Sequence, residues 1–84
     1  MQIQTSLDWI EVGGELTKQL NNLPYNLDLR RFIHNIDKMV VELSKAEVEA
    51  RRIRKLEYTK EKVDSINNAI DHLEKLILIA ELMR

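Results

Sequence analysis

The chain has 84 residues, and its 13 basic and 14 acidic side chains leave a formal net charge of −1 at pH 7. A chain this short forms at most one domain, and its single core is marginal without disulfides, a metal or oligomerisation. The absence of cysteine excludes disulfides and fits a reducing, cytoplasmic compartment, while the near-zero charge gives no overall field to attract nucleic acid or a membrane.

The first helix is expected over residues 6–22. Thr5 or Ser6 can cap its free amides, and Pro24 pushes Leu23 out of helical geometry, so the helix should end just before it. Four apolar residues, with Trp9 beside them, predict its buried face: Leu7, Ile10, Leu16 and Leu20.

Two adjacent glycines, Gly13 and Gly14, lie inside this first helix. An interior glycine costs roughly 1 kcal/mol relative to alanine. We expect the pair to allow close packing against another helix or a small kink, and a functional hinge is the alternative.

The second and third helices are longer and carry matching apolar stripes. The second should begin at Asn26 or Asp28 and cover residues 27–56, and the third should be capped near Thr59 and cover residues 60–84. The first stripe consists of Leu29, Phe32, Ile36, Met39, Leu43, Ala46, Ala50 and Ile53, and the second of Val63, Ile66, Ile70, Leu73, Ile77 and Ala80. Because both repeat every three or four residues, the two helices should pair as a long antiparallel hairpin in an all-α, three-helix, up-down protein.

The expected helix lengths leave part of this hairpin uncovered. At about 1.5 Å per residue, the first helix spans roughly 25 Å, the third roughly 37 Å and the second roughly 45 Å. A tight turn at Pro24 lays the first helix over only half of the hairpin, which leaves residues 46–66 as an arm without a third helix. Such an arm should project from the protein or be covered by another subunit.

Apolar residues outside the core stripes indicate self-association. Leu78, Ile79 and Leu82 fall on the far side of the third helix, and Val41 and Val48 lie off the stripe of the second. Each of them taken singly could be a core residue, but two neighbouring helices cannot easily cover the whole set. We therefore predict that they form an oligomer interface and that the assembly also binds a second protein.

Basic residues cluster where the second helix gives way to the third: Arg51, Arg52, Arg54, Lys55, Lys60 and Lys62. Such clustering suits phosphates, because each neutralised phosphate releases a counterion. Acidic residues interleave with these cations and Tyr58 is the one aromatic ring among them, so a solvated, ion-paired surface is the favoured interpretation. Contact with nucleic acid or with an acidic protein is the alternative.

Catalysis is not expected, and neither is a metal or another cofactor. His34 and His72 are far apart in the sequence and cysteine is absent, whereas a metal site needs three or four converging ligands. One enzymatic alternative stays open, because the segments Glu11 to Leu16 and Glu61 to Asp64 resemble the carboxylate elements of MazG-type nucleotide pyrophosphohydrolases. That resemblance implies four carboxylates on two helices that hold Mg²⁺ against a triphosphate. The chain departs from the pattern in its spacing, because Glu15 follows Glu11 by four positions in place of three.

Between about Leu23 and Met83 the order of features resembles that of a known family. They are the Leu23-Pro24 turn, Arg30 or Arg31 soon after it, a long helix that ends in alanine and basic residues (Ala46 to Lys55), and a Leu-x-x-Leu-x-x-x-Ala helix from Leu73 to Ala80. This order is similar to that of the four-helix-bundle family of retroelement accessory variability proteins and ribosomal intervening-sequence proteins. The resemblance implies a ring-forming bundle whose basic face binds nucleic acid and a reverse transcriptase. This chain lacks the fourth helix, which is consistent with another subunit supplying it.

We therefore expect a non-enzymatic, self-associating adaptor, accessory or inhibitor protein that acts through protein–protein contacts. A nucleic-acid-binding accessory protein and a MazG-like hydrolase are the alternatives. The longest strongly apolar run, Leu76 to Ala80, is far shorter than the about twenty residues of a membrane-spanning helix, and no basic segment followed by a long apolar stretch opens the sequence. We expect no signal peptide and no membrane association.

Overall fold

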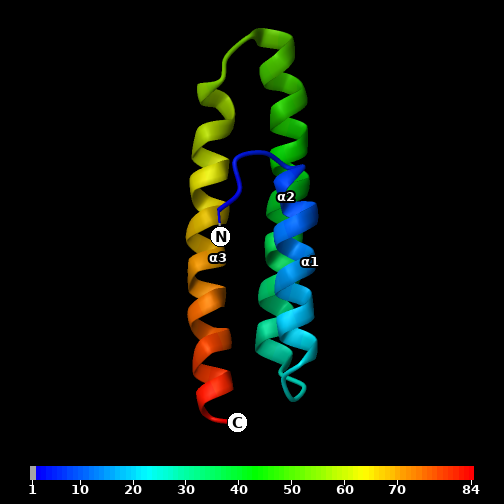
Figure 1. Cartoon of the computed structure of the whole chain (residues 1–84). Coiled ribbons are helices and arrows are strands. Elements are labelled where there is room, and N and C mark those ends of the chain that lie inside the picture. The colour runs from blue at the N-terminus through cyan, green and yellow to red at the C-terminus, as the bar shows by residue number, and fades with distance from the viewer. Residues whose placement is uncertain (1) are drawn as a thin grey trace.

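The computed structural model describes residues 2–84 as three α-helices joined by short connections (Figure 1). α1 covers Asp8–Asn21, α2 covers Leu27–Ile53 and α3 covers Glu57–Leu82. α2 and α3 form the expected antiparallel hairpin, and α1 folds back beside the lower half of α2 (Figure 1). The molecule is elongated, with extents of 48 × 18 × 15 Å.

The ends of the two long helices follow from their local chemistry. α2 begins as predicted, because Asn26 Oδ1 accepts hydrogen bonds from the backbone N–H groups of Asp28 and Leu29 at 3.0 and 3.3 Å. It ends at Ile53, three residues early, because Arg54 takes the left-handed conformation with φ 56°. α3 begins at Glu57, so the predicted cap at Thr59 is wrong.

The predicted cap of α1 at Thr5 or Ser6 is also wrong. The helix begins at Asp8, whose Oδ2 accepts hydrogen bonds from the backbone N–H groups of Gln4 and Thr5 at 3.0 and 3.2 Å. Ser6 is turned toward α2 instead, where its backbone N–H and its hydroxyl both donate to the Glu47 carboxylate. The chain before Asp8 is therefore held to the rest of the protein by side chains distant in the sequence.

The core lies between the three helices and draws mainly on the predicted stripes of α2 and α3. Its buried residues are Ile3, Leu16, Leu20, Leu23, Leu29, Ile36, Val40, Leu43, Ile66, Ile70, Leu73 and Ile77. Ile53 departs from the prediction with 41 % of its surface exposed, because it is the last residue of α2 and lies at the tip of the hairpin.

The buried face of α1 is rotated relative to the prediction. Leu16 and Leu20 are buried as expected, but Leu7 and Ile10 are 70 % and 74 % exposed. The inward face continues from Leu16 through Gly13, which is buried, to Trp9, which packs against the core. Steps of three and four residues keep these side chains on one side of a helix and turn Ile10 outward.

Gly13 makes room for Trp9 on this inward face. A Cβ atom at Gly13 would lie 2.7 Å from Cε2 of Trp9 and 3.0 Å from two other ring atoms. The ring can then donate a hydrogen bond from Nε1 to Oδ1 of Asp37 on α2, at 2.9 Å. Gly14 is exposed, and a Cβ there would meet nothing within 4 Å. Gly13 is therefore packed closely against a side chain of its own helix, in place of the expected packing against another helix.

Residues 2–7 form a strap that crosses the hairpin from α1 to α3, which the sequence analysis did not anticipate (Figure 1). Ile3 is fully buried, and the side chain of Asn67 on α3 holds its backbone. The Ile3 N–H donates to Asn67 Oδ1, and Asn67 Nδ2 donates to the Ile3 carbonyl, both at 2.8 Å. Together with the bonds from Ser6 to Glu47, these contacts tie α2 and α3 together at mid-length.

Candidate protein interaction surfaces

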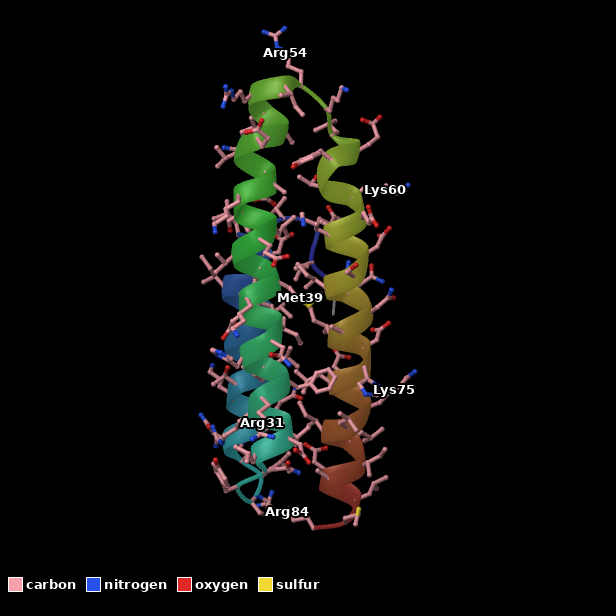
Figure 2. All side chains as sticks on the ribbon, turned by 180° about the vertical axis from the view of Figure 1, so that it is seen from behind. Arg31, Met39, Arg54, Lys60, Lys75 and Arg84 are labelled. Carbon is pink, nitrogen blue, oxygen red and sulfur yellow. The ribbon has the colours of Figure 1, made fainter. Side chains whose placement is uncertain are left out.

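The predicted arm is present above the strap. α1 lies beside the lower part of the hairpin, and in both views the upper part consists of α2 and α3 alone (Figures 1 and 2). The two helices pack closely there because Ala46 and Ala50 are the buried residues of α2 in this region. The arm therefore has a thin core and one broad side with no third helix.

An open groove with a volume of about 880 Å³ occupies this side of the arm. The strap bounds it at one end, and residues of α2 from Ser44 onward form its length. Leu7, Val48 and Leu56 line it and are 70 %, 66 % and 84 % exposed. Arg51 and Arg54 add positive charge to the same lining. The groove thus combines exposed apolar side chains with two cations, and its one acidic residue, Glu47, accepts the hydrogen bonds from Ser6.

Three exposed apolar side chains near the end of α3 form a second surface, which we call the C-terminal patch. Leu78, Ile79 and Leu82 are 56 %, 52 % and 78 % exposed, whereas the preceding residue, Ile77, is buried in the core. Leu78 also borders a shallow hollow that includes Gln19 of α1. The prediction that these three residues lie outside the core is confirmed, while their role as an interface stays a prediction.

Val41 and Val48 lie on the outside of α2, as predicted. They are 54 % and 66 % exposed and are seven residues apart, which places them on one side of the helix. Val48 lines the groove and Val41 does not. Val48 is near the end of α2 at the tip, so it does not join the C-terminal residues of α3, which lie at the other end of the hairpin (Figure 1).

The basic cluster surrounds the tip of the hairpin. Arg51, Arg52, Arg54, Lys55 and Lys60 are all exposed, and Arg54 and Lys60 point away from the ribbon (Figure 2). Two of the six predicted cations join loose ion pairs, Arg52 with Glu49 at 3.9 Å and Lys62 with Glu42 at 3.8 Å. Exposed pairs of this kind contribute little to stability, so the tip stays available to an anionic partner.

The carboxylates of the hydrolase alternative are not assembled into a metal site. Glu11 and Glu15 lie on the exposed side of α1, and Glu61 and Asp64 are exposed on α3. Across residues 2–84, no group of three or more acidic, histidine or cysteine side chains is placed to hold a metal ion. His72 instead packs its ring against Phe32, with centroids 5.1 Å apart.

Comparison with models of protein families, with curated proteins and with solved structures found no match to this chain. In the described part of the chain, no helix has both the length and the hydrophobicity needed to cross a bilayer.

Sequence reasoning missed two parts of these surfaces. Leu7 was assigned to the core and Leu56 to the end of α2, yet both line the groove. The strap that bounds the groove also went unrecognised. Its one available signal was Ile3, a single large apolar residue within the polar segment Gln2 to Ser6.

Proposed function

We propose that the protein is a non-enzymatic, self-associating adaptor, accessory or inhibitor protein that works through protein–protein contacts. The observation that carries this proposal is the C-terminal patch. Its three large apolar side chains are each more than half exposed and lie within two turns of one helix. Soluble monomers rarely leave apolar residues clustered in this way, and such clusters typically mark binding surfaces.

The size of the patch indicates what it can contribute. A fully buried side chain of this type gains roughly 1.5–3 kcal/mol, and about half to four-fifths of that gain is still available at these exposures. Six such side chains in a two-fold contact give roughly 6–12 kcal/mol, against an association cost of about 4–15 kcal/mol. The patch alone is therefore close to balance, and stable association draws on further surface.

More apolar surface lies at the same end of the molecule. Tyr25 and Leu27, in the connection between α1 and α2 and at the start of α2, are 73 % and 47 % exposed. The C-terminus of α3 lies at this end as well (Figure 1). The proposed second protein partner has this surface available beside the C-terminal patch.

Replacing Leu78 and Leu82 by glutamate tests the proposal. Both side chains are exposed in the single chain, so the double variant should keep its helicity, which circular dichroism measures. Light scattering should give a lower mass for this variant than for the wild type at the same concentration. Glu81, which is exposed between the two leucines, supplies a matched control, since Glu81→Gln removes a charge without touching the apolar side chains. An unchanged mass for the leucine variant would contradict the assigned role of the patch.

The exposed basic tip supports a second candidate, a nucleic-acid-binding accessory protein. Residues 51–60 carry five basic side chains and one acidic one, which is enough to contact several phosphates. This is also the role implied by the resemblance to the retroelement accessory proteins. The interleaved acidic residues around the tip and the overall charge of −1 make it the weaker of the two proposals.

A further inference from the structure

The groove lies where a continuation of α1 would pack. Below the strap, α1 contacts α2 through the hydrogen bond from Trp9 to Asp37. Ser44 and Arg51 follow Asp37 at intervals of seven residues, so all three lie on one side of α2. Ser44 and Arg51 line the groove. The surface of α2 that receives α1 therefore continues upward and stays vacant.

The open side of the arm is long enough to receive most of α1. On α2 the groove lining begins at Ser44, and the helix continues to Ile53, which is about 15 Å; Arg54 and Leu56 prolong the lining over the tip. α1 has 14 residues and is about 21 Å long. One helix of this size would cover the open side of the arm from the strap to the tip.

The outer side of α1 carries acidic side chains, whereas the groove carries basic ones. Ile10 is 74 % exposed there, and Glu11 and Glu15 are exposed carboxylates one helical turn apart. In the groove, Arg51 and Arg54 are also about one turn apart, beside exposed apolar side chains. Ile10 and the two acids, with Lys18 one turn after Glu15, thus complement exposed apolar side chains and two bases in the groove.

Charge argues against two arms packing on each other. Residues 51–60 carry five basic side chains and one acidic one, so two tips brought together would repel.

Arg54 also adopts a left-handed backbone conformation, with φ 56°, that glycine would adopt with less strain. An arginine at this position brings a cation to the groove at a conformational cost.

We propose that the groove is filled by α1 of a second copy of this chain, in an antiparallel dimer with two-fold symmetry. α1 runs antiparallel to its own α2, so the two-fold axis makes it parallel to α2 of the other copy. Glu11 and Glu15 then ascend in the same direction as Arg51 and Arg54. The contact occurs twice in the dimer, and each α1 lies between its own hairpin and the other arm. This inference rests on the proposed self-association but uses a surface separate from the C-terminal patch.

A charge exchange between two variants tests this pairing. One variant carries Arg51→Glu with Arg54→Glu, and the other carries Glu11→Arg with Glu15→Arg. Each variant alone places like charges across both copies of the contact, so neither should dimerise. A mixture forms a heterodimer in which both contacts regain opposite charges, one reversed and one native. All four side chains are exposed, so both variants should keep the wild-type helicity.

Both variants are made in the Leu78→Glu, Leu82→Glu background, so that the C-terminal patch does not contribute. Light scattering should give about 20 kDa for the background protein, twice the 9.9 kDa of one chain. It should give the single-chain mass for each charge variant alone and about 20 kDa again for the mixture. Arg31→Glu with Lys38→Glu reverses two exposed charges elsewhere on α2 and should leave the dimer intact.

Three results would overturn the inference: a background protein of single-chain mass, charge variants that still dimerise alone, or a mixture that stays at single-chain mass. None of them depends on the C-terminal patch. Failure of the patch proposal has a different signature, because the Leu78→Glu, Leu82→Glu protein would then keep the full mass of the wild type.

Discussion

The hydrogen bonds between Asn67 and the strap allow a quantitative prediction with a neighbouring control. Asn67→Ala removes both 2.8 Å bonds to the Ile3 backbone. Each such bond contributes about 0.5–1.5 kcal/mol, so the loss is about 1–3 kcal/mol. Alanine also forms helix more readily than asparagine, which returns roughly 0.6 kcal/mol. Asn68→Ala, at an exposed position of the same helix, has the same propensity gain and breaks neither bond.

The difference between the two variants therefore isolates the strap contact. We expect Asn67→Ala to be about 2 kcal/mol less stable than Asn68→Ala, which at about 4–8 °C per kcal/mol corresponds to a difference in melting temperature of about 8–16 °C. Circular dichroism at 222 nm measures both transitions, and equal protein concentrations keep any oligomerisation comparable. Melting temperatures within about 2 °C of each other would refute the reasoning that the strap is fixed by Asn67.

Two further sets of variants test the helix packing and the basic tip. Gly13→Ala should destabilise the protein by about 1–2 kcal/mol in urea unfolding, because the new Cβ displaces the Trp9 ring and breaks its hydrogen bond. Gly14→Ala should stabilise the protein by up to about 1 kcal/mol, and equal effects of the two variants would contradict the packing described. If the tip binds nucleic acid, replacing Arg51, Arg52, Arg54 and Lys55 by glutamine should abolish binding in a mobility-shift assay and flatten its salt dependence. A wild type that binds no DNA or RNA at low salt would end that alternative.

The hairpin could be predicted because its helices are long and strongly periodic. Fourteen stripe positions over α2 and α3 point in a consistent direction, so a few errors at their ends do not alter the pairing. The short α1 offers fewer positions, and its inward face passes through Gly13, which has no side chain to register in a hydrophobic pattern. Leu7 and Ile10 gave a stronger hydrophobic pattern, but it marks the side of α1 that is exposed.

The candidate surfaces also include parts that follow from local sequence and parts that depend on the fold. The exposure of Leu78, Ile79 and Leu82 followed from the angle between residues on one helix, which is a local property. The strap depends on Asn67, which lies 64 residues from Ile3, and no local pattern marks such a pair. The arm was predicted from helix lengths alone, but the residues that line its groove come from three separate segments that only the fold brings together.

The mass of the wild-type protein in solution tests the central claim of self-association most directly. Light scattering coupled to size exclusion, over a dilution series that starts at tens of micromolar, should give a mass well above the 9.9 kDa of one chain and a decrease toward it on dilution. A constant mass of 9.9 kDa across the series would contradict the account.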